Sequence, residues 1–305
     1  MHFINANKHR IMILLPLLAV MIWSFNVVLN RYSIDYISPL SISFYRWLIP
    51  FVLLTPFMLK SVWQHKVSIC IYWKKIAILS ALGMVISQGL GYVASHYTTA
   101  IHMGMINAFV PLITLILAYL ILKEPLKIYN VVGGLISILG LLLIISQGKL
   151  SNLFNLNISG YGDGLMLLAV MSYAFYCVLL KKWEIKLSFL LILYLQMAFA
   201  VLYHFPFVFN YGLNTIDQSN LPIILYAGVC TSLISSLLWM IAVNQLGAHQ
   251  TSMFMNLMPI FTACIATLWL GEHWFYYHSI GAVIIIVGLC MSRNLKIFKF
   301  NRTSY

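Results

Sequence analysis

The chain has 305 residues, of which 62% are hydrophobic and only 8% are charged. Soluble domains are about half apolar and about a quarter charged, so this composition excludes an ordinary soluble domain and indicates a protein of the lipid bilayer. The 18 Lys and Arg against 6 Asp and Glu give a net charge of +12, which in a soluble protein would suggest nucleic-acid binding. In a membrane protein the placement of the charges explains the same excess differently.

The sequence contains ten apolar runs of about 20 residues, the length that crosses about 30 Å of hydrocarbon as an α-helix. They cover residues 12–30, 39–59, 76–95, 100–122, 128–146, 163–180, 189–209, 221–246, 248–270 and 276–292. The first run follows three basic residues, as a signal peptide would, but it lacks a small-residue cleavage site and continues into Trp23 and Asn26. We therefore predict an all-α integral membrane protein with ten transmembrane helices.

The Lys and Arg residues are divided unevenly between the two ends of these runs. If the N-terminus is cytoplasmic, 15 of them fall on the cytoplasmic side and only Arg31 and Lys149 on the outer side, with Arg46 inside the second run. Cytoplasmic loops of membrane proteins are rich in Lys and Arg. This pattern predicts that both termini are cytoplasmic, and we expect no nucleic-acid partner.

A stretch of the first half recurs in the second half. Residues 100–141 align without a gap with residues 248–289, and the matched pairs include Pro111 with Pro259 and Glu124 with Glu272. Apolar composition alone would not place Pro and Glu in register. Five predicted spans per half is an odd number, so the second half must enter the membrane in the opposite sense.

This repeat predicts the organisation of the chain. We expect two inverted five-helix repeats, at residues 1–150 and 163–305, joined by a linker at 151–162, with a basic cytoplasmic tail ending the second repeat. Inverted repeats are a recurrent plan of secondary transporters, because two related halves can rock about a site at mid-depth.

The first two runs place polar side chains in apolar surroundings. Trp23, Asn26 and Asn30 share one helix face, and buried amides without partners are costly, so this face is expected to meet protein or water. An interhelical hydrogen bond that only holds the bundle together is the alternative. Arg46 lies about 10 Å below the outer surface at helical rise; we expect it to reach outward or to pair with Asp35, with substrate attraction as the second interpretation.

The third and fourth runs continue this pattern. Gln88 and Tyr92 share a face of the third run, and Asn107 and Pro111 share a face of the fourth. A proline inside a transmembrane helix frees a carbonyl and bends the axis. Because Pro111 matches Pro259 in the repeat, we predict that the two prolines are paired hinges that widen the space between the halves.

The second half supplies comparable side chains, with Tyr173 and Tyr176 at the positions that correspond to Trp23 and Asn26. We predict a substrate-binding cavity that is polar but uncharged and has aromatic walls. Its expected lining is Trp23, Asn26, Gln88, Tyr92, Asn107, Tyr173, Tyr176, Ser236, Trp239 and Asn256. Such a lining can hydrogen-bond a zwitterion and stack on its apolar, aromatic or cationic portion, but it offers no fixed charge for a phosphate.

Several of these motifs resemble one known family. Trp23-Ser24-Phe25, Arg46, the segment Tyr92 to Ala100, Leu122-Lys123-Glu124-Pro125 and Leu270-Gly271-Glu272 are similar to the drug/metabolite transporter superfamily, EamA branch. The resemblance covers the whole chain as two EamA units. It implies a multi-pass carrier of the bacterial inner membrane, with a central cavity lined by the first, third, fourth, sixth, eighth and ninth helices. Similar members export amino acids and related metabolites, whereas others take up nucleotides, cofactors or S-adenosylmethionine.

The predicted function is therefore export of a small neutral or zwitterionic metabolite by alternating access, with amino acids as the leading candidates. Uptake of S-adenosylmethionine, a nucleotide or a cofactor is the alternative, and a non-transporting membrane scaffold or sensor is the alternative from another class. All six acids fall at span ends or in loops, so a buried carboxylate relay for protons is not expected. Facilitated transport or exchange is thus favoured over proton coupling through histidine.

The sequence gives little sign of other chemistry. His96 and His102 lie six positions apart without an evident partnered carboxylate or Cys, so an enzyme is not expected. The five Cys are scattered without metal-ligand spacing, and we expect no metal and no cofactor. The glycines of the fifth and tenth runs, including Gly140 and Gly288, are expected to serve close helix packing, with a homodimer face as the alternative.

Overall fold

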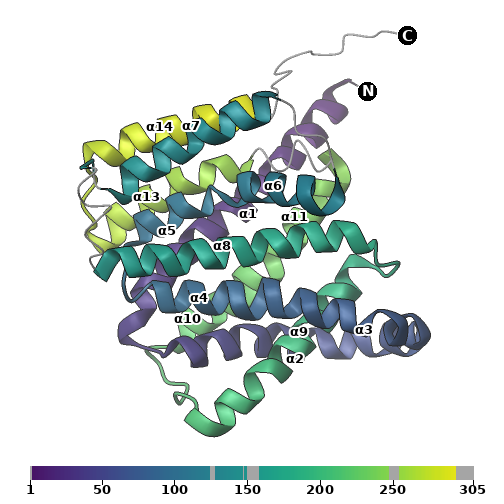
Figure 1. The fold of residues 1–305 in the computed structure, drawn as a ribbon. Helices are drawn as coiled ribbons and strands as arrows, with labels where there is room; N and C mark the ends of the chain where they lie inside the picture. The colour runs from purple at the N-terminus through teal and green to yellow at the C-terminus, as the bar shows by residue number, and fades with distance from the viewer. Residues whose placement is uncertain (1, 124–127, 147, 150–157, 247–253, 293–305) are drawn as a thin grey trace.

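A computed structural model of the chain describes residues 2–123, 128–146, 148–149, 158–246 and 254–292. Within these ranges all regular secondary structure is helical (Figure 1). The α-helices are α1 (His2–Tyr32), α2 (Pro39–Gln64), α3 (Lys66–Ser80), α4 (Ser87–Ala94), α5 (Ala100–Asn107), α6 (Val110–Leu122), α7 (Ile128–Ile145), α8 (Ile158–Trp183), α9 (Phe189–Tyr211), α10 (Leu221–Leu225), α11 (Ser235–Leu246), α13 (Met258–Leu270) and α14 (Tyr276–Ser292).

Seven helical stretches of the described ranges are long and apolar enough to cross a membrane, which confirms the all-helical membrane architecture. They are Leu14–Asp35, Pro39–Gln64, Lys66–Ala94, Ala100–Leu122, Gly160–Trp183, Phe189–Tyr211 and Leu221–Ala242. Three shorter apolar helices, Val131–Ile144, Met258–Leu270 and Tyr276–Gly288, fall in the predicted fifth, ninth and tenth runs. The count of ten spans, the inversion of the repeats and the domain boundaries stay predictions. Glu124, most of the linker and the basic tail lie outside the described residues.

Two of the long helices contain π-helical segments that no sequence pattern predicted. Segment η2 (Ala81–Ile86) joins α3 to α4, and segment η4 (Tyr226–Ile234) joins α10 to α11. The first of these two helices also starts at Lys66, earlier than the predicted run at 76. A π-helical turn widens the backbone locally and is frequently found at functional sites. Both segments contribute residues to the cavity described below.

The prolines predicted as hinges stand at helix starts. The helix that begins as α5 is interrupted after Asn107, and Pro111 occupies the first turn of α6. Pro259 occupies the first turn of α13, directly after the short 3-10 helix η5 (Phe254–Leu257). Proline is tolerated in a first helical turn because its missing N–H has no intrahelical partner there. The expected bends are thus breaks, and their role as hinges stays a prediction.

Helices α7 and α14 run side by side along one edge of the bundle (Figure 1). A Cβ atom on Gly140 would lie 2.8 Å from the carbonyl oxygen of Gly281, and one on Gly288 would lie 2.6 Å from the backbone nitrogen of Ser137. Only glycine permits this approach. These glycines therefore pack α7 against α14 within one chain. A homodimer stays a prediction, but these glycines do not form its interface.

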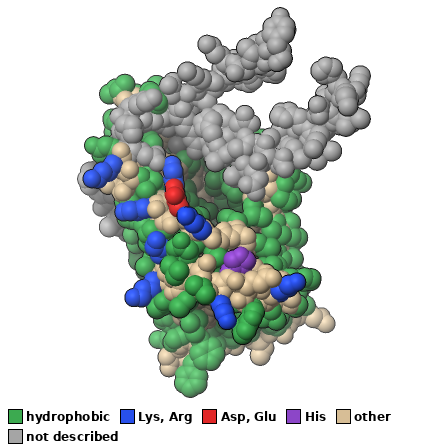
Figure 2. Space-filling view, turned by 90° about the vertical axis from the view of Figure 1, so that its right-hand side faces the viewer, with side chains coloured by type: hydrophobic (Ala, Val, Ile, Leu, Met, Phe, Trp, Pro, Cys, Tyr) green, Lys and Arg blue, Asp and Glu red, His purple; other side chains and the backbone are tan. Residues whose placement is uncertain are grey.

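One end of the bundle is basic. Exposed side chains at this end include Lys60 and Lys66 at the turn between α2 and α3, and Lys181, Lys182 and Lys186 at the turn between α8 and α9. Figure 2 looks onto this end and shows the Lys and Arg side chains distributed over it. Helix α1 begins and α14 ends at the same end of the bundle (Figure 1). The arrangement is the one that the positive-inside rule requires if this end faces the cytoplasm.

Candidate functional site

A cavity of about 210 Å³ lies among α1, α2, α4, α5, α8, α9 and α11, and α6, η5 and α13 contribute one lining residue each. Both π-helical segments border it, through Gly83 and Met84 of η2 and through Thr231 and Ser232 of η4. Its walls combine apolar side chains with a small number of amides and hydroxyls, as ligand-binding cavities do.

Most of the side chains predicted from the sequence meet at this cavity. Those that line it are Trp23, Asn26, Gln88, Asn107, Tyr173, Tyr176, Ser236 and Trp239. Tyr92 is buried, and its hydroxyl accepts a hydrogen bond from Arg46, which lines the cavity. The side chain of Asn256 lies outside the described residues. The cavity also has lining residues that sequence reasoning did not assign to it, among them Ser87, Thr231 and Ser232.

Aromatic rings form two parts of the cavity wall. Trp23 of α1 and Trp239 of α11 have ring centroids 5.1 Å apart at an interplanar angle of 52°. Tyr173 and Tyr176, both on α8, have centroids 5.5 Å apart and stack at 29°. Rings in this arrangement offer both π faces and polar edge atoms to a bound solute.

The cavity contains a fixed positive charge, which corrects the expectation that it is uncharged. Arg46 lines it and is only 4% exposed. Its Nε atom donates to Ser232 Oγ at 2.9 Å, and its Nη1 atom donates to Gln88 Oε1 at 2.8 Å and to the Tyr92 hydroxyl at 3.1 Å. Asp35 is exposed in the short 3-10 helix Ser33–Asp35 that follows α1, and it does not pair with Arg46. The expected outward reach or Asp35 pair is wrong, because α2 packs against η4 and α4 at this depth and their polar groups surround the guanidinium.

Asn26 takes part in an interhelical hydrogen bond and also lines the cavity. Its Oδ1 atom accepts from the Thr231 hydroxyl at 3.2 Å, and its Nδ2 atom donates to Asn30 Oδ1 at 3.2 Å. The structural and the cavity-lining interpretations of this amide therefore hold together. The Asn26 amide ties α1 to η4 at the edge of the space that a solute would occupy.

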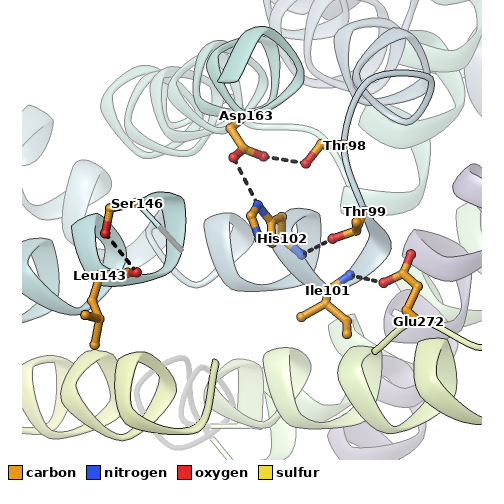
Figure 3. Close-up of polar contacts among 8 residues, drawn as sticks. All are labelled: Thr98, Thr99, Ile101, His102, Leu143, Ser146, Asp163 and Glu272. Carbon is orange, nitrogen blue, oxygen red and sulfur yellow. Dashed lines mark hydrogen bonds and ion pairs between the residues drawn. The ribbon is translucent and has the colours of Figure 1, made fainter. Parts of the chain in front are cut away.

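A second buried polar cluster links α5 to α8 (Figure 3). The Nδ1 atom of His102 lies 3.0 Å from Oδ2 of Asp163, and the side chains are 6% and 3% exposed. Oδ1 of the same carboxylate accepts from the Thr98 hydroxyl at 2.5 Å. The expectation that His102 has no carboxylate partner is wrong, because the turn between α4 and α5 brings it against the start of α8.

The carboxylate of Glu272 holds the start of α5 (Figure 3). Its Oε1 accepts from the backbone N–H of Ala100 at 2.8 Å and its Oε2 from that of Ile101 at 3.0 Å. The first N–H groups of a helix have no intrahelical acceptor, and a negative charge there is stabilised by the helix dipole. Glu272 thus joins the turn after α13 to α5, beside the His102–Asp163 pair.

Two further histidines, His204 of α9 and His96, do not line the cavity. His204 is buried, with its Nε2 atom 2.9 Å from Ser43 Oγ and its Nδ1 atom 2.7 Å from the carbonyl of Ala200. His96 lies in the turn after α4 and is exposed. Partial burial and then the nearby Arg31 guanidinium lower the pKa of His96, against a weaker opposite effect of Asp35. Both effects favour the neutral form of the His96 ring. Among the residues that the structure describes, no three His, Cys, Asp or Glu side chains gather as metal ligands.

A bundle of apolar helices around a polar, aromatic-walled cavity defines a membrane protein of the solute-transporter class. The model of the EamA-like transporter family matches residues 10–146 and again residues 160–293. The chain belongs to this family.

Relatives in several organisms are similar over most of the chain. An uncharacterized transporter of Bacillus subtilis, YyaM, is 27% identical over 279 residues, which cover 90% of each chain. An uncharacterized transporter of Archaeoglobus fulgidus is 24% identical over 94% of this chain and 98% of its own. A WAT1-related protein of Arabidopsis thaliana, At2g40900, is 27% identical over 70% of this chain and 60% of its own.

A crystal structure of another protein superposes with a TM-score of 0.58 over 92% of this chain and 96% of that one. The sequences are 12% identical, so this likeness shows a shared fold alone.

Proposed function

We propose that this EamA-family transporter exports small zwitterionic metabolites, amino acids first, across the bacterial inner membrane by alternating access. The observation that carries the proposal is the cavity itself, whose amides, hydroxyls and paired rings match a solute with both charged and apolar parts. A volume of about 210 Å³ favours a small solute over a nucleotide or S-adenosylmethionine.

The arrangement of the helices supports alternating access. The cavity is bordered by helices from both predicted repeats, and the α5–α6 break and the two π-helical segments stand at or beside it. Interrupted helices at mid-depth are where transporters of inverted-repeat design bind substrate. In this proposal Pro111 and Pro259 are the hinges, and the basic end, where α1 begins and α14 ends, is cytoplasmic.

The transport test uses the purified full chain in liposomes that are preloaded with one amino acid and supplied outside with a radiolabelled trace of the same compound. We expect saturable counterflow for at least one member of a panel of the common amino acids. Trp239→Ala is expected to raise the half-saturation concentration about tenfold, because it removes half of the ring pair. Trp269→Ala is the matched control, since Trp269 stacks on Phe25 and does not line the cavity. Absence of counterflow for the whole panel would reject the proposed function.

The direction of flux is tested in cells. We expect a strain without the protein to accumulate the transported compound internally when it is supplied as a peptide, and to release it more slowly into the medium. Faster release from the deletion strain would favour uptake.

A further inference from the structure

The Arg46 guanidinium is a buried cation for which the described part of the chain provides no anion. Of the described carboxylates, Asp163 is engaged by His102 and Thr98, and Glu272 by the start of α5. The other three, Asp35, Glu184 and Asp217, are exposed. A cation this deep in an apolar bundle is costly unless it is paired.

The protein compensates the charge of Arg46 only in part. Its three hydrogen-bond acceptors are neutral groups, on Gln88, Tyr92 and Ser232. The guanidinium carbon also lies 5.1 Å from the ring centroid of Trp47 and 5.9 Å from that of Tyr92. Neutral dipoles and ring faces lower the cost of burial, but they leave the net charge of the cavity at its full value.

Donors remain available around Arg46 for an anion that enters the cavity. The hydrogen bonds of the described structure use Nε and Nη1 of Arg46, and none uses Nη2. Because Gln88 accepts from Arg46 through Oε1, its amide NH2 group is left to donate, and Gln88 also lines the cavity. A guanidinium fork with a neighbouring amide N–H is a suitable set of donors for the two oxygens of a carboxylate.

We infer that Arg46, supported by Gln88, is the subsite that binds a carboxylate group of the transported solute, and that it makes the cavity select acids over their neutral or cationic analogues. This inference rests on the proposed function and narrows its substrate class. A carboxylate fits better than a phosphate, because the described cavity lining contains one guanidinium and no Lys. With the carboxylate at Arg46, the remainder of the solute meets the Trp23–Trp239 and Tyr173–Tyr176 rings.

The test measures binding to the purified full-length protein in detergent, separately from transport. Thermal-shift titrations compare matched pairs of L-phenylalanine with L-phenylalaninamide, L-leucine with L-leucinamide and L-glutamine with L-glutaminamide, in a buffer whose only anion is chloride. In each pair the carboxylate is replaced by an amide of nearly the same size. We expect at least one acid to bind about tenfold or more tightly than its amide, because charge-assisted hydrogen bonds are about twice as strong as neutral ones. If no pair prefers the acid, the inference is overturned, whatever the transport assay shows.

Variants test whether Arg46 causes the preference for the acid over its amide. Arg46→Gln is expected to reduce the acid-to-amide ratio to near one, and Arg46→Lys to retain part of it as a point charge without the fork. Arg31→Gln is the matched control, because Arg31 donates to the carbonyl of Ser95 at 2.5 Å and does not line the cavity. An acid preference that survives in Arg46→Gln would overturn the inference.

A separate titration uses inorganic phosphate as the ligand. Phosphate binding tighter than the binding of every acid would reject the carboxylate assignment. Acid-selective binding without any counterflow would reject the proposed function alone.

Discussion

Two buried polar clusters of the described structure differ in whether the chain supplies a carboxylate partner. In the cluster between α5 and α8, His102 meets the Asp163 carboxylate at 3.0 Å, and Thr98 binds the other carboxylate oxygen. In the cavity, Arg46 meets only neutral side chains. The first cluster is complete within the chain, whereas the second is complete only when an anion is present.

This difference indicates different tasks for the two clusters. A satisfied buried network rigidifies the elements that it joins, and here it joins α5 to α8 while Glu272 adds the turn after α13. An unpaired charge at a cavity makes the empty site costly and the occupied site favourable. We therefore assign the His102–Asp163 cluster to structure and Arg46 to ligand binding, and the two assignments predict opposite responses to substitution.

The largest effect on stability is expected from Asp163→Ala. It leaves the His102 ring and the Thr98 hydroxyl without their buried hydrogen-bond partner, and two unsatisfied buried groups together cost about 3 kcal/mol. Denaturant unfolding of the purified protein in detergent measures the loss. In a double-mutant cycle, Asp163→Ala combined with His102→Ala should lose less than the sum of the single variants.

Asp217→Ala is the matched control for this cluster. Asp217 is an exposed loop carboxylate that bonds to Ser219 and Asn220 within its own turn. A loss for Asp163→Ala no greater than that of Asp217→Ala would show that the buried pair does not stabilise the fold.

A smaller loss is expected from Glu272→Gln. The amide keeps one acceptor for the N–H groups of Ala100 and Ile101 but removes the charge that interacts with the start of α5. Loss of such a helix-start interaction costs about 1 kcal/mol. The same unfolding assay, run beside the exposed-carboxylate variant Glu184→Gln, measures it. Equal stabilities of the two variants would remove Glu272 from the structural cluster.

Local sequence patterns predicted the helices and most of the cavity lining, because both depend on short-range periodicity. Apolar runs mark the spans, and helical spacing brings Trp23 and Asn26 onto one face. The environment of Arg46 depends instead on Gln88 and Ser232, which lie 42 and 186 positions away. No local pattern reports such a contact, so the sequence favoured an outward reach or a pair with Asp35 and kept substrate attraction only as the second interpretation.

Two further features were beyond local patterns for related reasons. His102 and Asp163 lie 61 positions apart and meet only after α8 packs against α5. The π-helical segments η2 and η4 contain ordinary apolar and small residues, with no proline or charge to mark them. Tertiary packing determines both features, and both shape the region around the cavity.

The smallest effect on stability is expected from substitution of Arg46, because the described chain provides no anion that would be left unpaired. Arg46→Met removes a buried cation, whose desolvation is costly, and replaces it with an apolar chain. It also leaves the Tyr92 hydroxyl, which is buried, without the Arg46 donor. Combining Arg46→Met with Tyr92→Phe removes this donor together with the buried hydroxyl, while Gln88 and Ser232, the other two acceptors, line the cavity, and Ser232 keeps its hydrogen bond to the carbonyl of Ala227. The double variant should unfold within about 1 kcal/mol of wild type in carboxylate-free buffer.

Addition of a carboxylic acid ligand shows whether the double variant has lost ligand binding or merely tolerates the substitutions. An acid that raises the unfolding midpoint of wild type should leave the double variant unchanged, because occupancy stabilises only a protein that binds the ligand. The Arg31→Gln variant, with its cavity intact, should respond as wild type does. A loss in Arg46→Met/Tyr92→Phe as large as that in Asp163→Ala would mean that the charge of Arg46 is already compensated inside the chain. The assignment of Arg46 to ligand binding and of the His102–Asp163 cluster to structure would then be wrong.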